Sequence, residues 1–298
     1  MTGVQTCALP ILFKKVVIAD TFAPWATAGF DTATTLNLIE AWATSLSYTF
    51  QLYFDFSGYC DMAIGIALLF NIKLPINFNS PYKALNIQDF WRRWHITLSR
   101  FLRDYVYIPL GGNKKGSFRT YNNLLATFVI GGLWHGAGWT FVFWGFLHGL
   151  ALVIHRVWTN LGFKMNTILA WFITFNFVNI AWIFFRAKDW DSAIKVLSSM
   201  FSLDNVVLPN FLESKLQFLK SFGITFGGFV SNIGGDYFTP LWFIFAFILV
   251  LVFKNSMIYL NSNFKANKKY LLLSIYLFSY AFITSVMSSS KVFLYFNF

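Results

Sequence analysis

The chain has 298 residues, of which 57% are apolar and only 12% are charged, and its mean hydropathy is +0.56. Soluble domains carry about 25% charged residues, so this composition excludes an ordinary soluble protein and predicts an all-α, polytopic transmembrane helical bundle. The net charge of +11 lies mostly in loops between apolar segments, as the positive-inside rule predicts. This distribution argues against a nucleic-acid partner and favours the lipid bilayer, with anionic headgroups or an anionic acyl donor.

The first residues differ in character from the rest of the chain. Residues 1–11 contain no basic n-region and no cleavage site, so they do not predict a signal peptide. We expect this stretch to be an unrelated leader and residues 12–298 to form the transmembrane domain. Residues 13–31 are mildly apolar and predict an interfacial helix.

A long apolar segment comes next, but carboxylates interrupt it. Residues 36–56 are long and apolar enough to span a membrane. The polar run DFSGYCD at residues 55–61 predicts a break, and residues 62–72 predict a second, shorter helix. Pro75 and Pro81 then mark a loop.

Residues 86–110 differ from the segments around them. Their apolar residues recur at steps of three and four, while arginines and Asp104 interrupt the stripe. This pattern is typical of an amphipathic helix that lies in the membrane interface or re-enters the fold. A basic, turn-rich loop follows at residues 109–116.

The remaining apolar segments predict further spans, some of them short enough to be tilted or discontinuous. They cover residues 121–134, 139–157, 167–185, 239–253 and 270–287. The polar excursion at residues 186–236 is nearly charge-balanced and is expected to face outward, with an amphipathic helix at residues 192–201.

Charge predicts the orientation of these spans. Residues 86–119 hold seven Lys or Arg against two Asp, and residues 254–269 hold four Lys and no acidic residue. Both segments are therefore expected to be cytoplasmic, which requires the two spans around His135 to form a hairpin. We expect His135 near the outer turn of this hairpin and His95 in the cytoplasmic-side helix, so that the two histidines lie near opposite faces.

His135 lies in an otherwise apolar run, at residues 124–145. A titratable imidazole at membrane depth is costly, usually faces a protein interior or a water-filled cavity, and is a functional-site hypothesis. Glycines on both sides of it permit a broken helix, which is tolerated where backbone lines a cavity. The alternative is a histidine hydrogen-bonded across a helix interface.

His95 follows Trp91 by four residues and Arg92 by three, so on one continuous helix the three would share a face. Arginines beside a histidine suit an anionic group such as phosphate or a carrier-linked acyl donor. The alternative is a juxtamembrane anchor whose arginines meet lipid phosphates. His148 and His155 are expected to be structural.

Histidines in a bundle without a recognisable metal or nucleotide motif indicate proton-transfer chemistry. We expect no metal site, because the sequence has no His-x-x-x-His or Cys-x-x-Cys pattern and no acidic cluster. An imidazole can act as general base toward a hydroxyl. Acyl transfer from a thioester to an alcohol needs such a base, alignment and an oxyanion donor. The indole of Trp134 or Trp139, or backbone N–H groups at residues 136–138, could be that donor.

A different class of function is also compatible with these residues. A transporter or flippase could use His135 as a proton relay in a discontinuous helix. Such a protein should show paired broken helices in two repeated halves, and the sequence contains no such repeat. A purely structural membrane scaffold is a third hypothesis.

Four motifs carry a resemblance to the membrane-bound O-acyltransferase family. They are YFDFSGYCD at residues 53–61, FWRRWH at 90–95, RDYVYIPLGG at 103–112 and GLWHG at 132–136. Within that family the chain resembles the alginate O-acetyltransferase branch more than the D-alanyl-lipoteichoic acid branch, because of the run at residues 108–116. Residues 293–298 also resemble the C-terminus of that branch. Family members are longer, so the chain looks like a C-terminal fragment whose N-terminal spans are missing.

The resemblance implies a function and roles for single residues. His135 would be the catalytic base on the outward side of a tunnel through the membrane, and His95 would lie nearer the cytoplasmic donor entrance. The resemblance implies no bound cofactor and an acyl thioester, acetyl-CoA or an acyl carrier, as the co-substrate. The acyl group, acetyl in this branch, would move to hydroxyls of an extracytoplasmic polysaccharide, with a periplasmic or extracellular acetyltransferase as partner, in the bacterial inner membrane. The residues predicted to bind substrate are Trp134, Trp139, Arg92, Arg93 and Asp104.

Overall fold

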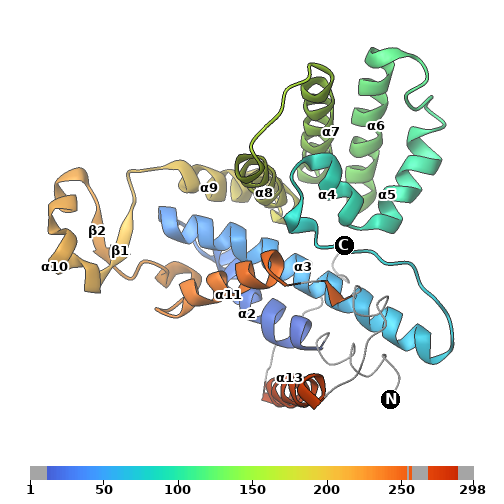
Figure 1. Ribbon diagram of the computed structural model, residues 1–298. Helices are drawn as coiled ribbons and strands as arrows, with labels where there is room; N and C mark the ends of the chain where they lie inside the picture. Colours follow the sequence, from blue (N-terminus) through green and yellow to red (C-terminus); the bar gives the residue numbers. More distant parts are fainter. Residues whose placement is uncertain (1–11, 254, 257–267, 288–298) are drawn as a thin grey trace.

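The computed structural model describes residues 12–253, 255–256 and 268–287, and these are almost entirely helical (Figure 1). The predicted all-α helical bundle is confirmed. The predicted leader at 1–11, the motif at 293–298 and most of the basic loop at 254–269 lie outside the described residues. The elements are α2 (Asp20–Thr27), α3 (Leu38–Leu69), α4 (Ile87–Arg93), α5 (Ile96–Leu102), α6 (Gly116–His135), α7 (Trp139–Asn160), α8 (Thr167–Arg186), α9 (Trp190–Phe201), β1 (Val207–Pro209), α10 (Glu213–Leu216), β2 (Thr225–Gly227), α11 (Thr239–Leu251) and α13 (Lys268–Met287).

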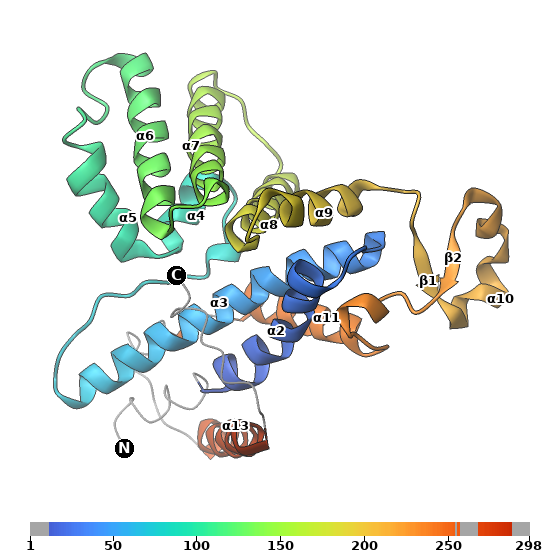
Figure 2. The same ribbon diagram turned by 180° about the vertical axis from the view of Figure 1, so that it is seen from behind.

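The long helix α3 is the axis of the fold. In both views α8 and α9 lie on one side of it, while α2, α11 and α13 lie on the other (Figures 1 and 2). The antiparallel pair α6 and α7 stands beside α8 as the predicted hairpin. Among the described residues, α3, α7 and α8 are long and apolar enough to cross a membrane.

The break predicted at residues 55–61 is wrong, because α3 continues through it without interruption. Two lysines from the helical segment Phe13–Ala19 neutralise the carboxylates that suggested the break. Lys15 Nζ lies 3.1 Å from Asp55 Oδ1, and Lys14 Nζ lies 2.7 Å from Asp61 Oδ2. The lysine segment is itself buried against α3 rather than lying free in an interface.

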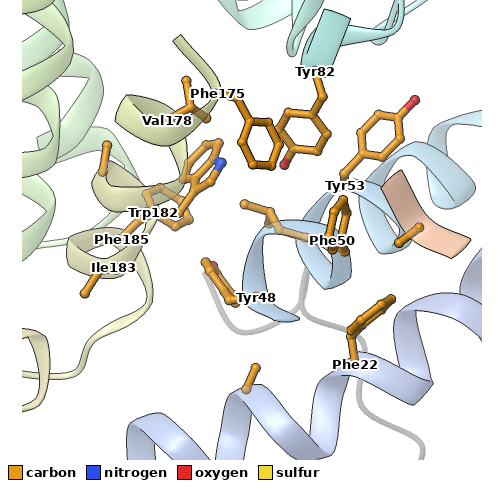
Figure 3. Close-up of a cluster of buried hydrophobic side chains, with 14 of the residues drawn as sticks. Phe22, Tyr48, Phe50, Tyr53, Tyr82, Phe175, Val178, Trp182, Ile183 and Phe185 are labelled. Atoms are coloured by element: carbon orange, nitrogen blue, oxygen red, sulfur yellow. The ribbon is translucent and has the colours of Figure 1, made fainter. Parts of the chain in front are cut away.

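An aromatic core joins α3 to α8 (Figure 3). Tyr82 lies between Tyr53 of α3 and Phe175 of α8, with ring centroids 5.2 and 5.6 Å away. Its hydroxyl donates to the carbonyl of Thr49 at 2.8 Å, and its own carbonyl accepts from the indole of Trp171 at 2.9 Å. The short segment around Tyr82 therefore fixes α3 and α8 together just before α4 begins.

The polar excursion contains one feature that the sequence did not suggest. The predicted amphipathic helix at 192–201 is present as α9, but two three-residue strands follow it, β1 and β2, which pair in parallel. The segments predicted as the later spans form the apolar helices α11 and α13, whose apolar stretches, within the described residues, are shorter than those of the helices able to cross a membrane.

Candidate active site

His135 is the last residue of α6 and lies where that helix turns into α7. Gly136 has extended backbone (φ 169°), and α7 starts only three residues later. The imidazole is half-buried, with aromatic ring centroids at 4.8 Å (Trp134), 5.4 Å (Trp144) and 4.9 Å (Phe185). No described side chain hydrogen-bonds to its ring nitrogens. They are therefore available to a substrate.

Glycines allow α6 and α7 to pack with their backbones in contact. A Cβ atom at Gly132 would collide with the carbonyl oxygen of Phe141, and one at Gly145 would collide with that of Phe128. The glycines around His135 thus serve helix packing as well as the turn. α6 itself stays helical up to His135.

His95 breaks the helix that the sequence predicted to be continuous. It lies between α4 and α5 in the left-handed region (φ 41°, ψ 58°), which a non-glycine residue rarely adopts. Trp91 and Arg92 therefore do not share a helical face with it, and that prediction is wrong. Periodicity could not show the break, because the apolar steps continue on both sides of it.

The loop before α4 holds the His95 ring. The side-chain oxygen of Asn77 accepts from the Thr97 backbone N–H (3.1 Å) and hydroxyl (2.6 Å), and lies 3.3 Å from His95 Nδ1. Since that oxygen is an acceptor, Nδ1 carries the proton and Nε2 has the free lone pair. Phe56 contacts the same ring at 4.9 Å. His95 lies outside the membrane-spanning helices, and burial lowers its pKa to about 4, so the imidazole is neutral at pH 7.

The two histidines lie at the same end of the hairpin, not near opposite faces as expected. They are close enough that a positive charge on the His95 ring would disfavour one on His135. The side chain of Leu102 in α5 lies 3.1 Å from the Cβ position of Gly131, four residues before His135. α4 contacts α7, and after the break α5 packs against the end of α6 (Figure 1).

Of the predicted substrate residues, only some lie near the histidines. Trp134 is exposed and contacts the ring of His135. Trp139 is exposed at the start of α7, three residues after the turn. Arg92 is exposed on α4, three residues before His95.

The other two predicted substrate residues are engaged in local ion pairs. Arg93 Nε donates to Asp89 at 2.9 Å, one turn earlier on α4. Arg103 Nε donates to Asp104 at 2.7 Å; both are exposed, and this hydrogen bond lowers the pKa of the Asp104 carboxyl. No described contact joins Arg93 or Asp104 to either histidine.

Sequence reasoning underrated three residues beside the site. His148 is fully buried in α7, and its Nδ1 accepts from the Trp91 indole N–H at 3.2 Å. Trp144, one turn before it, contacts both His148 (4.9 Å) and His135 (5.4 Å). The i, i+4 spacing of Trp144 and His148 was the available signal. The partner Trp91 comes from 57 residues earlier in the chain.

Among residues 12–253, 255–256 and 268–287, no group of three or more His, Cys, Asp or Glu side chains is placed to hold a metal ion. The side chains that surround the two histidines are mostly aromatic.

The sequence model of the membrane-bound O-acyltransferase family matches residues 3–188 of the chain. The chain belongs to this family. The match contains the four motifs, both histidines and all of α2 to α8, and the predicted resemblance is confirmed. It begins inside the stretch set apart as a leader, and the domain boundary at residue 12 stays a prediction.

Three relatives of this chain illustrate the range of similarity. A peptidoglycan O-acetyltransferase of Helicobacter pylori is 55% identical over 298 residues, covering 96% of this chain and 55% of the relative. A protein of Pseudomonas aeruginosa named "Probable alginate O-acetylase AlgI" is 48% identical over 208 residues, covering 70% of this chain and 40% of the relative. A teichoic acid D-alanyltransferase of Bacillus subtilis is 33% identical over 161 residues, covering 48% of this chain and 40% of the relative. The chain thus spans about half the length of the relatives that it matches.

Proposed function

We propose that this chain carries the acyl-transfer site of a membrane O-acyltransferase. The proposal rests on one observation: a half-buried imidazole with free ring nitrogens, His135, lies beside a second histidine at the junction of α6, α7 and the α4–α5 segment. A general base within reach of both reactants is what acyl transfer to a hydroxyl requires. Family membership favours this function over the transporter or flippase with a histidine proton relay.

In the proposed reaction His135 takes the proton of an acceptor hydroxyl as its oxygen attacks the thioester carbonyl. A C–O bond forms, and the carbonyl oxygen becomes negatively charged. When the intermediate collapses, the C–S bond breaks and the sulfur leaves with the proton from His135. One thioester and one alcohol thus give one ester and one thiol, without an oxidant or a metal.

His95 serves a different purpose in this proposal. Asn77 fixes its Nδ1–H, so the Nε2 lone pair can accept a hydrogen bond from a substrate. Burial keeps the ring uncharged at pH 7, and a neutral ring avoids placing a second positive charge beside His135 when that base becomes protonated. His95 therefore orients a reactant, while His135 carries the proton.

The relatives guide the choice of substrates. We propose an acetyl group, a cytoplasmic thioester donor (acetyl-CoA or an acyl carrier) and an extracytoplasmic polysaccharide acceptor in the bacterial inner membrane. Peptidoglycan comes before alginate as acceptor, because the relative named for peptidoglycan matches 96% of the chain and the one named for alginate matches 70%. A periplasmic or extracellular acetyltransferase partner follows the same reasoning.

The test uses the complete gene product in its own membrane. His135→Ala should reduce the acetyl content of the cell-wall glycan about 1,000-fold, within the range expected for loss of a general base. His155→Ala, a histidine at the far end of α7, is the matched control and should leave acetylation unchanged. Normal acetylation in His135→Ala, with normal membrane insertion, would refute the catalytic role.

A further inference from the structure

His148 has one nitrogen engaged and one without a partner. Its Nδ1 accepts from the Trp91 indole N–H, so that nitrogen carries no proton. The proton of the neutral ring is therefore on Nε2. Nε2 is fully buried and has no hydrogen-bond acceptor among the described residues.

A second unpaired donor lies directly beside it. Trp144 is 2% exposed, and its Nε1–H also has no acceptor among the described residues. The ring centroids of Trp144 and His148 are 4.9 Å apart, and the two residues lie one turn from each other on the same face of α7. Phe177 contacts the ring of His148 and Phe185 that of Trp144, and aromatic rings are at best weak acceptors.

Two adjacent buried N–H groups without acceptors are unusual in a folded protein. Such groups are nearly always paired, because a buried donor without a partner loses its hydrogen bonds to water and gains none within the protein. Trp144 connects this pair to the candidate base, because its ring centroid is 5.4 Å from that of His135. The missing acceptor is therefore expected to arrive with a substrate.

We propose that Trp144 Nε1–H and His148 Nε2–H bind the carbonyl oxygen of the acyl group and stabilise the negative charge that develops on it. This inference rests on the proposed acyl transfer and names the oxyanion donors within it. It replaces Trp134 and Trp139, whose indoles are exposed; buried, preorganised donors are the more effective kind. The ligand class is an acyl thioester.

Trp91 is a positioning residue in this arrangement. Its indole N–H donates a hydrogen bond to Nδ1 of His148 and thereby keeps the ring proton on Nε2. The ring of Trp91 also contacts those of Trp144 at 5.8 Å and His148 at 5.0 Å. Trp91 lies in α4, four residues before His95. The α4 segment would therefore position both His95 and the donor pair of Trp144 and His148.

The experiment combines turnover with the binding of two inert probes by the complete protein in detergent. S-acetonyl-CoA has a carbonyl near the position of the thioester carbonyl, and S-propyl-CoA has none. Wild-type protein should bind the acetonyl probe about tenfold more tightly than the propyl probe. Trp144→Phe should remove that preference and lower kcat about 100-fold, as loss of one oxyanion donor does.

Further variants separate a donor from a merely structural ring. His148→Phe should behave like Trp144→Phe, whereas His148→Gln, which keeps an N–H donor, should recover part of the preference and of kcat. Trp91→Phe should weaken the preference less. Trp158→Phe, the same substitution at the other end of α7, is the control and should change neither quantity.

The outcomes distinguish this inference from the proposed function. Unchanged kcat and an unchanged probe preference in Trp144→Phe and His148→Phe would overturn the donor pair and leave acyl transfer standing. A wild-type protein that neither transfers acetyl from a thioester nor discriminates between the probes would overturn both. Loss of the preference in both variants, with partial recovery in His148→Gln, would establish the donor pair.

Discussion

The close packing of α6 on α7 predicts that one added methyl group will impair the site. In Gly132→Ala the new Cβ would meet the carbonyl of Phe141, whose carbon lies 3.1 Å away and whose oxygen is nearer still. Both groups are helical backbone, so the helices must separate by about 1 Å to regain ordinary contact distances near 3.5 Å. Overpacking of this kind costs about 1–3 kcal/mol of stability.

The displacement occurs three residues from His135 and should affect function more than stability. A misplacement of ~1 Å at a catalytic group can cost about 100-fold in rate. The assay is acetyl transfer by the complete protein, with thermal unfolding in detergent alongside. Gly65→Ala in α3 is the matched control, because a Cβ there meets nothing within 4 Å. If Gly132→Ala is as active and as stable as Gly65→Ala, the packing argument is refuted.

Three further predictions concern the ionisable residues. His95→Ala should lower transfer about tenfold, well short of the loss in His135→Ala; an equal loss would contradict a purely orienting role. Burial lowers the pKa of His95 from 6.5 to about 4, so on acidification the unfolded chain binds a proton at a higher pH than the folded chain does. The free energy of unfolding should therefore decrease as the pH is lowered from about 6.5 to about 4. His95→Asn should flatten that slope in pH-dependent unfolding, and an identical slope would disprove the assignment. Lys15→Met removes one member of the buried Lys15–Asp55 ion pair and should cost about 3 kcal/mol, partly recovered in Lys15→Met/Asp55→Asn; equal stability of both variants would contradict the ion pair.

The positions of the helices were largely predictable from the chain alone. A helix that crosses lipid must satisfy its own backbone and present about 20 apolar residues, and this requirement marks α7, α8 and most of α3 as runs in the sequence. His135 was identifiable from the same apolar runs, because an ionisable side chain in such a run is costly and is usually functional.

The breaks and continuities were not predictable, because partners distant in sequence decide them. α3 passes through Asp55 and Asp61 because two lysines from much earlier in the chain neutralise both carboxylates. The opposite occurs at His95, where periodicity indicates one helix but Asn77 holds the left-handed residue that ends it. Local patterns contain no information on either partner.

The sequence by itself determined the class of protein, the apolar elements and the histidine most suited to proton transfer, since these follow from composition and from the chemistry of single side chains in lipid. Only the tertiary structure decided which groups meet. It brought His95 to the His135 end of the hairpin and gave His148 its hydrogen bond from Trp91. The physical reason is that helix packing, set by glycine contacts and a single left-handed residue, joins segments whose order along the chain does not specify their distance in space.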